Sequence, residues 1–471
     1  MKVLMNVGLV ACSIQLSSCA LFPRDVQPER TIKPLETLES NLGKQNVQID
    51  DQWWIAYGDP QLNQLVALGL QRSPSLDMAG ARILAAQAML EAEKAALIPQ
   101  IGVSGDIERQ KLSRNYIFLP GMPTYTGYGQ VDASLSWSLD IWGKQKKYYE
   151  AAKNQQKVAL ASYKASELLI ASTIVRIYFD YDRLIQAELL FARDAEIKKM
   201  LYQIAQDRHK AGLLDMVIVN QRKIDAEVAQ VNFNQAHLAK KMAQHQLAAL
   251  VQEGPSWGEK LKAPATQLAA LNLPEMIPAN LLERRPDLQA LLSQIDVARL
   301  QLEGAKLEYL PDINLTGFVG VQSFNLPQLF SGKSQQFGIG PTVGLPIFDG
   351  GLINANIVSK EANRDQAIAA YQEQLAQALK EVADSLGSIR SAQANYANYD
   401  LSYQTAKNNY DIIRHRSDVG INSKESVLSV EQAYIAQEQN FADAKQKLLT
   451  ANVVLIQALG GSYLKSPAQP H

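Results

Sequence analysis

The sequence predicts an α+β membrane protein in which each chain carries two tandem structural repeats and contributes four strands to a closed, oligomeric β-barrel that continues as an α-helical tube. Three features lead to this fold class: an internal repeat over most of the chain, four segments in which apolar and polar residues alternate, and helices far longer than a small sheet could cover. Together they require several chains, because four strands alone cannot close a barrel.

The internal repeat is visible at two separate places. Segment 208–213 (RHKAGL) matches 416–421 (RSDVGI) at an offset of 208 residues, and segment 73–76 (SPSL) matches 285–288 (RPDL) at an offset of 212. A repeat of this size predicts two equivalent supersecondary units, each with a helix, two strands, a very long helix, a turn and a second long helix.

The bulk composition excludes several classes of protein. The chain has 471 residues, 47% hydrophobic content and a formal net charge of −1, which favours neither disorder nor a polyanionic partner such as nucleic acid. Beyond the first ~20 residues there is no uninterrupted apolar run of ~18 residues, so we expect no transmembrane helix. A chain of this kind that spans a membrane must do so as a closed β-barrel.

The N-terminus has the features of a lipoprotein signal peptide. An apolar core at 3–14 precedes Leu-Ser-Ser-Cys at 16–19, which is the pattern of a bacterial lipobox. We expect cleavage before Cys19 and a covalent lipid on that residue, with no other cofactor. Ala20 follows instead of aspartate, which favours sorting to the outer membrane. An ordinary signal peptide with an incidental cysteine is the alternative.

Four segments alternate apolar and polar residues, two in each repeat. In 128–141 the apolar residues share one face and the polar residues share the other, and 101–107, 313–321 and 337–347 follow the same pattern. Strands of roughly ten residues suit a tilted crossing of a bilayer. A soluble β-sandwich would show the same alternation and is the alternative here.

Long helices occupy most of the remaining chain. Segment 144–211 contains neither glycine nor proline and would extend roughly 100 Å at 1.5 Å per residue. Segments 213–253, 352–419 and 421–459 complete two helical hairpins. A heptad seam is expected along the first helix, which predicts supercoiled packing. Its members are Ile170, Ile174, Ile177, Tyr181, Leu184, Phe191 and Ala195. A free-standing coiled-coil rod is the alternative.

A shorter helical pattern precedes the first strand. It runs from Pro60 to Ile98, and we expect breaks near Gly69, Pro74 and Gly80.

Two copies of the chain would give eight strands, whose interior is filled by side chains, whereas three would give twelve and a lumen wide enough for water. We therefore expect a trimer that forms a duct, with the helices continuing its wall.

Four segments of the sequence resemble a known family. They are Trp53–Pro60 (WWIAYGDP), Leu281–Leu288 (LLERRPDL), Leu310–Gly317 (LPDINLTG) and Pro346–Gly351 (PIFDGG). In this order they are similar to the TolC/OprM family of outer-membrane efflux ducts, specifically its lipid-anchored, NodT-like branch. The resemblance implies a homotrimer with a twelve-stranded outer-membrane barrel and a long periplasmic α-barrel. It also implies passive export of small molecules such as drugs, toxic compounds or metal ions, with antibiotic resistance as a consequence. The implied partners are a periplasmic adaptor (membrane fusion) protein and an inner-membrane transporter.

The resemblance places the closed periplasmic end at two turns, 211–215 and 419–423. In relatives the second turn is usually followed by a run with two aspartates, but here the matching run 425–429 is Glu-Ser-Val-Leu-Ser. Glu425 and Asp418 are the nearest carboxylates; they either replace the missing aspartates or are ordinary solvated charges. The candidate aperture residues are Gly212, Asp215, Asp418, Gly420, Glu425, Ser426 and Ser429.

The expected divisions of the chain follow from these motifs. They are a signal peptide (1–18), a lipid-anchored N-terminal tail (19–59), the first repeat (60–253), an inter-repeat connection (254–277), the second repeat (278–461) and a C-terminal tail (462–471).

No residue pattern points to catalysis. The five histidines form no metal-ligand motif, and no Ser/His/Asp or paired-carboxylate arrangement stands out, so we expect neither an enzyme nor a metal site. Two other functions remain open: the outer duct of a protein-secretion system, and a structural surface lipoprotein that does not conduct. The sequence of a duct names neither its substrate nor the class of its pump.

Overall fold

The computed structural model describes residues 52–111, 113, 115, 125–268 and 284–461. The expected signal peptide, the lipidation site Cys19 and the C-terminal tail 462–471 lie outside the described residues. The chain divides into two compact units. The first contains 83–158 and 291–372, the second contains the rest of the described chain, and each draws residues from both predicted repeats.

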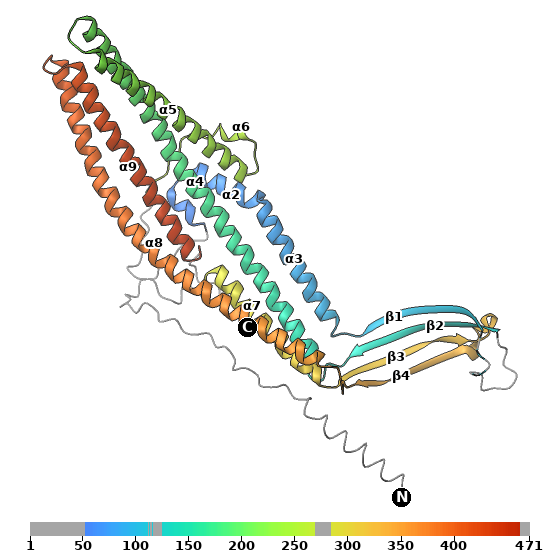
Figure 1. Cartoon of the computed structure of the whole chain (residues 1–471). Helices are drawn as coiled ribbons and strands as arrows, with labels where there is room; N and C mark the ends of the chain where they lie inside the picture. The colour runs from blue at the N-terminus through green and yellow to red at the C-terminus, as the bar shows by residue number, and fades with distance from the viewer. Residues whose placement is uncertain (1–51, 112, 114, 116–124, 269–283, 462–471) are drawn as a thin grey trace, which may run out of the picture. The chain divides into compact units, whose positions relative to one another are not determined.

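The first unit contains an antiparallel sheet whose order along the sheet is the order in the sequence (Figure 1). The strands are β1 (Gln100–Lys111), β2 (Tyr125–Ser138), β3 (Asp312–Ser323) and β4 (Gln335–Gly344). All four predicted strands are therefore present. Their predicted ends were partly wrong: β2 ends at Ser138 and β4 at Gly344, so Leu139, Ile141, Leu345 and Ile347 lie beyond the strands.

The end of β2 has a local cause. Asp140 adopts a positive φ of 44°, and its carboxylate accepts hydrogen bonds from the backbone N–H groups of Gln145 and Lys146, both at 2.8 Å. The side chain thus caps the following helix and turns the chain out of the sheet.

The strand register separates the two faces of the sheet. Leu135 of β2 lies between Ile101 of β1 and Gly317 of β3, and Phe337 of β4 lies beside Val319 of β3. Residues alternate along each strand, so these pairs define one continuous apolar face. Its members include Ile101, Val103, Ile107, Val131, Ala133, Leu135, Trp137, Leu315, Val319, Val321, Phe337, Ile339 and Val343. The opposite face carries mainly polar residues and glycine, as the sequence predicted.

Helices form most of the rest of the described chain. They are α2 (Pro60–Arg72), α3 (Pro74–Ala95), α4 (Lys144–Lys210), α5 (Met216–Leu250), α6 (Pro255–Gly258), α7 (Pro286–Lys306), α8 (Leu352–Asp418) and α9 (Lys424–Ala458), with 3₁₀ turns η2 (Trp53–Tyr57), η4 (Leu307–Tyr309), η5 (Leu326–Gln328) and η6 (Gly332–Ser334). Helices α4 and α8 each have 67 residues, and α5 and α9 each have 35. The long helices thus begin and end within a few residues of the predicted positions.

Of the three breaks expected before the first strand, only the one at Pro74 occurs. Ser73 is extended, with ψ at 118°, because the proline ring disfavours a helical conformation in the residue before it. The breaks expected at Gly69 and Gly80 were wrong, since both residues lie inside helices. Glycine in a helix interior costs only about 1 kcal/mol, and Gly69 leaves space that the side chain of Ile174 occupies.

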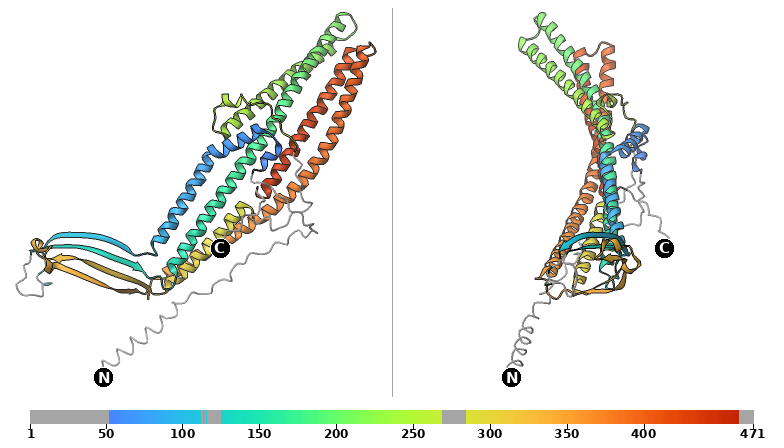
Figure 2. Two further views of the ribbon diagram at one scale, coloured as in Figure 1. Left: turned by 180° about the vertical axis from the view of Figure 1, so that it is seen from behind. Right: turned by 90° about the vertical axis from the view of Figure 1, so that its right-hand side faces the viewer.

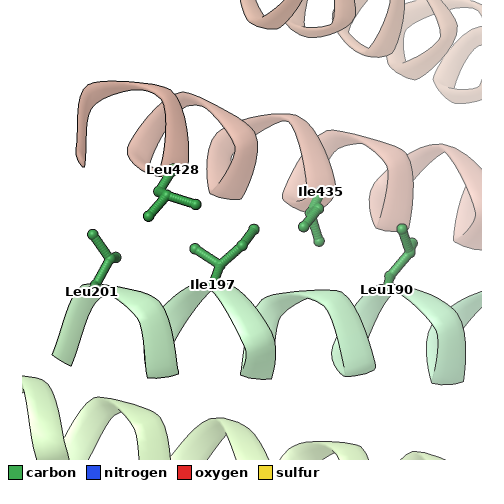
Figure 3. Packing of buried hydrophobic residues seen from close by; sticks show 5 residues of the cluster. All are labelled: Leu190, Ile197, Leu201, Leu428 and Ile435. Atoms are coloured by element: carbon green, nitrogen blue, oxygen red, sulfur yellow. The ribbon is translucent and has the colours of Figure 1, made fainter. Parts of the chain in front are cut away.

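In the second unit α4 packs on α9 through a small apolar cluster. Leu190, Ile197 and Leu201 of α4 meet Leu428 and Ile435 of α9 (Figure 3). Leu190 and Ile197 are seven residues apart, as are Leu428 and Ile435, which is the spacing of a coiled coil.

The heptad seam predicted along α4 lies on a different row of side chains from the one that contacts α9. Its members Ile174, Tyr181 and Leu184 are buried, but the residues that meet α9 are Leu190 and Ile197 rather than Phe191 and Ala195.

Helices α8 and α9 run side by side, as do α4 and α5 (Figure 2). Tyr396, Tyr403 and Tyr410 of α8 alternate with Tyr434 and Phe441 of α9 in one stack, with ring centroids 5.2–5.7 Å apart. Because the tyrosines on α8 recur every seven residues, the stack holds the second hairpin together along several turns.

The first block of the family resemblance has a structural role. Asp59 is buried and caps α2 by accepting the backbone N–H of Gln61 at 2.9 Å. The Tyr178 hydroxyl of α4 donates to its other oxygen at 2.8 Å, as does the backbone N–H of Ala265. Burial and this hydrogen bond raise the pKa of Tyr178. One carboxylate thus joins α2, α4 and the segment after α6.

Helix α4 contains an 18-residue window of mean hydropathy 1.3 that could cross a membrane by length and composition, with 28% of the window buried. Apolar side chains of α4 also pack within the second unit: Val175 and Phe179 are buried, and the Tyr57 ring lies 4.9 Å from that of Phe179.

Candidate functional site

The two helix-turn-helix tips have the same backbone geometry. Gly212 and Gly420 have φ values of 75° and 77°, a region that favours glycine. The backbone N–H of Leu213 bonds to the carbonyl of Arg208 at 2.9 Å, and that of Ile421 bonds to Arg416 at 2.8 Å. Both helices therefore end in a Schellman motif, which explains the two glycines among the predicted tip residues.

In each tip a side chain caps the N-terminus of the second helix. Asp215 accepts the backbone N–H of Val217 at 2.7 Å, and Ser423 accepts that of Ser426 at 3.2 Å. The predicted tip residue Asp215 thus has a local structural role, because an acceptor at the N-cap satisfies one of the free N–H groups of a helix start.

The carboxylates at the second tip have different surroundings. Asp418 is exposed at the last position of α8, whereas Glu425 forms an ion pair with Arg208 of α4, with 2.7 Å between the nitrogen and the oxygen. Ser429 is exposed and Ser426 is half-buried. The structure thus brings Glu425 together with a residue of the first tip.

Arg208 was missed in the sequence. Basic residues are common near a helix C-terminus, because a positive charge there interacts favourably with the negative end of the helix dipole. Nothing in the local pattern indicated a partner 217 positions away.

The α4–α9 seam carries further charged pairs. Arg193 bonds to Glu431 at 2.6 Å and Lys445 to Asp182 at 3.0 Å. Glu431 is buried, so its negative charge depends on Arg193 for compensation. Polar pairs therefore occur along this seam from Asp182 to the tip.

The α4–α5 seam contains one carboxylate with two basic partners. Glu188 accepts from Lys240 and lies within hydrogen-bond distance of His237, both at 2.5 Å. Burial alone would raise the pKa of Glu188, but the hydrogen bonds and charges of Lys240 and His237 lower it. The sequence assigned His237 to no metal-ligand motif, and no pattern in it indicated this contact. Among the described residues no group of three His, Cys, Asp or Glu side chains could hold a metal ion.

The polar face of the sheet carries a hydrogen-bonded network around Asp132. Its carboxylate accepts from Gln130 and, at 2.8 Å, from Gln336 of β4, and Tyr128 donates to Gln130. Gln336 reaches Asp132 across β3 because Gly320 lies between them: a Cβ on Gly320 would lie 2.1 Å from an Asp132 oxygen. Asp132 is only 6% exposed.

The family block at the start of the second repeat is also structural. Arg285 is 6% exposed; it donates to Asp287 at 2.7 Å, to Glu381 of α8 at 2.8 Å and to the carbonyl of Ala458 at 3.1 Å. Burial would raise the pKa of Asp287, but Arg285 lowers it. This arginine therefore connects the start of α7 with α8 and the end of α9.

Known proteins resemble the chain over most of its length. The family model described as "Outer membrane efflux protein" matches residues 65–252 and 277–461. The multidrug resistance outer membrane protein MdtQ of Escherichia coli O157:H7 is 29% identical over 426 residues, which cover 88% of each chain.

Solved structures agree with this relationship. The outer membrane protein VceC of Vibrio cholerae is 28% identical, with a TM-score of 0.78 over 88% of this chain and 99% of that one. The outer membrane channel CmeC of Campylobacter jejuni is 26% identical, with a TM-score of 0.79 over 94% and 96%. With two family matches that together span most of the sequence, the chain belongs to the family of outer membrane efflux proteins.

Proposed function

We propose that three copies of this chain form a twelve-stranded barrel in the outer membrane, continued by a periplasmic α-helical barrel, and that this duct exports small molecules passively. The observation that carries the proposal is the sheet: one apolar face, one polar face and two strands that, in the described chain, each pair on one side only. In lipid the free edges of β1 and β4 would leave backbone groups unpaired, so they must pair with another copy.

The polar face of the sheet favours three copies over two. A barrel of eight strands is filled by its own side chains, whereas twelve strands leave room for water. The polar face around Asp132 would then line the lumen, and the apolar face would contact lipid.

The helices of the second unit offer matching surfaces for closure. Helix α5 has exposed apolar residues at coiled-coil spacing: Ile224, Val228, Val231, Leu238 and Met242. Helix α8 has Leu401 and Ile412, which are also exposed, and the exposed Val419 follows directly after it. Since α5 packs on α4 and α8 on α9, we infer that α5 of one copy packs against α8 of the next. The equal lengths of the two hairpins support a wall of two tandem repeats per chain.

We further propose the expected partners: a periplasmic adaptor protein and an inner-membrane transporter that supplies the energy. The relatives are named for this type of export, among them the antibiotic efflux pump outer membrane protein ArpC of Pseudomonas putida, 24% identical over 473 residues. Drugs and other toxic small molecules are therefore the proposed substrates.

A covalent lipid on Cys19, cleavage after residue 18 and the predicted domain divisions belong to the same proposal.

The tips are the proposed periplasmic aperture. Three copies of the second tip would meet near the axis. This chain has Ser426 and Ser429 where relatives usually have two aspartates, so Glu425 and Asp418 are the nearest carboxylates. Because Arg208 neutralises Glu425 in the described arrangement, the aperture would be less attractive to cations than one with free carboxylates.

Native mass measurement of the detergent-solubilised protein tests the assembly, and a stable monomer or dimer would contradict it. Planar-bilayer conductance then separates a duct from a non-conducting surface lipoprotein. Deletion of the gene with drug and metal susceptibility assays separates small-molecule efflux, which predicts increased sensitivity, from protein secretion, which does not.

A further inference from the structure

One end of the sheet has an unusual charge composition. The sequence contains no Asp or Glu from 109 to 131 or from 313 to 348, the two stretches that hold the loops joining β1 to β2 and β3 to β4. The same stretches contain Arg109, Lys111, Arg114 and Lys333, although the whole chain has a net charge of −1. Of these, the described residues Arg109, Lys111 and Lys333 lie at the loop end of the sheet, opposite the end at which the strands join the helices.

The described residues of β1 show which face carries this charge. Arg109 and Lys111 follow Ile107 at steps of two, so they share the apolar face. Asp106 and Glu108 alternate with them and lie on the polar face. Acidic and basic residues of one strand are thus separated onto opposite faces of the sheet.

The contacts of the two basic residues leave their charges uncompensated. Lys111 lies over the ring of Tyr125, 5.4 Å from its centroid, and Tyr125 is its partner in the strand register. Both Arg109 and Lys111 are exposed, and within the described chain no carboxylate lies within ion-pair distance of either. The loop that follows contains no acidic residue that could provide one.

We propose that Arg109 and Lys111 bind the phosphate groups of the phosphorylated glycolipid in the outer leaflet of the outer membrane. This inference rests on the proposed barrel, in which the apolar face contacts lipid and the loop end faces the outside. Arg109 and Lys111 lie about 7 and 13 Å beyond Ile107 along the strand, at ~3.3 Å per residue, which places them where acyl chains give way to headgroups.

The side-chain chemistry fits this ligand. A guanidinium donates two parallel hydrogen bonds to one phosphate, and an ammonium donates as a compact charge. Tyrosine is favoured at the same level of a membrane, because its ring contacts apolar groups and its hydroxyl contacts water. The pair would take the role that divalent cations have between neighbouring phosphates in that leaflet.

The test uses the full-length protein purified as its assembled oligomer in mild detergent and titrated with lipopolysaccharide. A second titration uses lipopolysaccharide whose lipid A phosphates have been removed. R109Q/K111Q is compared with the charge-preserving variant R109K/K111R and with K223Q/K260Q, which removes one exposed charge from α5 and one from the turn after α6. Native mass of each variant is recorded first, so that a failure of the barrel proposal appears as lost assembly and not as lost binding.

We expect the wild type to bind the phosphorylated form more tightly than the dephosphorylated form. R109Q/K111Q should bind the phosphorylated form roughly 30-fold more weakly, the effect of two basic residues beside an anionic surface, whereas both comparison variants should bind like the wild type. Equal binding of the two forms by the wild type, or unchanged binding by R109Q/K111Q in an intact oligomer, would overturn the inference. A change in ion selectivity of conductance without a change in binding would also overturn it, because it would place these side chains in the lumen.

Discussion

The Arg208 guanidinium lies 2.7 Å from the Glu425 carboxylate, so an ion pair joins the end of α4 to the first turn of α9. Their side chains are 45% and 33% exposed, so the pair adds about 1 kcal/mol or less to stability. Its importance is electrostatic: each copy of the pair determines how much negative charge the second tip presents.

Opposite effects on ion selectivity are expected from the two members of this pair. Glu425→Gln removes a carboxylate and leaves Arg208 unpaired, so cation preference should fall. Arg208→Gln frees Glu425, so cation preference should rise, and both effects should be larger at low salt, where screening is weakest. Reversal potentials in planar bilayers measure this. Asp215→Asn is the control, because asparagine also caps a helix. Unchanged reversal potentials in both variants at low salt would place the pair outside the aperture.

The two faces of the sheet should tolerate charge differently. Leu135 lies on the apolar face and Ser136 on the polar face. An arginine facing lipid near mid-bilayer costs roughly 2–4 kcal/mol, whereas one facing water costs little. Leu135→Arg should therefore reduce the yield of assembled oligomer, and Ser136→Arg should assemble normally with altered conductance. Equal yields of the two variants would argue against the proposed orientation of the sheet.

Glycine at position 320 should be required for the register between β2 and β3. A Cβ there would lie 2.1 Å from the backbone oxygen of Val131 and from an oxygen of Asp132, whereas a Cβ on Gly340 of the same face meets nothing within 4 Å. Gly320→Ala should lower assembly and thermal stability, while Gly340→Ala should leave both near wild type. The measurement is the fraction of oligomer that survives heating in detergent, and equal survival of the two would exclude a tight strand approach at Gly320.

The buried guanidinium of Arg285 should be important for stability. Arg285→Gln removes the partner of Asp287 and Glu381, both about one-third exposed, so we expect a loss of about 3 kcal/mol, at the low end for a broken buried pair. Arg299→Gln, whose ion pairs are exposed, should cost about 1 kcal/mol or less. Denaturant unfolding followed by helical circular dichroism distinguishes the two.

The ion pair between Arg285 and Asp287 should also make the stability of the fold depend on pH in the acid range. The pKa of Asp287 is lowered in the folded chain, so the pair stabilises the folded state above the unfolded pKa of about 3.9 and loses this effect as the pH falls through the folded pKa. The wild type should therefore lose stability below about pH 4 more steeply than Arg285→Gln. Parallel pH profiles would show that Asp287 does not contribute.

Lipidation can be separated from assembly. Acyl chains on Cys19 would each add about 0.8 kcal/mol per buried methylene, but the barrel should hold the oligomer in the membrane without them. Cys19→Ala behind a cleavable signal should lose lipid label and still assemble. A mature wild-type protein without acyl mass on Cys19 would disprove the lipoprotein prediction.

Much of the fold could be predicted because its determinants are local. Alternation with a period of two fixed the faces of β2 and β3, and the absence of proline from 144–211 fixed the extent of α4. The glycines of the two tips and the cap at Asp215 also follow from neighbouring residues, since a Schellman motif and an N-cap involve only a few consecutive positions.

The sequence by itself determined the order of the strands and long helices, the approximate extent of the long helices, and the resemblance to the family. Only the tertiary structure decided which surfaces meet: that Leu190 and Ile197 pack on α9, that Gln336 reaches Asp132 over Gly320, and that Arg208 neutralises Glu425. The physical reason is that hydrophobic period and turn chemistry are set within a few residues, whereas an ion pair between positions 208 and 425 depends on how two helical hairpins align. Small differences in side-chain packing decide that alignment, and the sequence pattern does not record them.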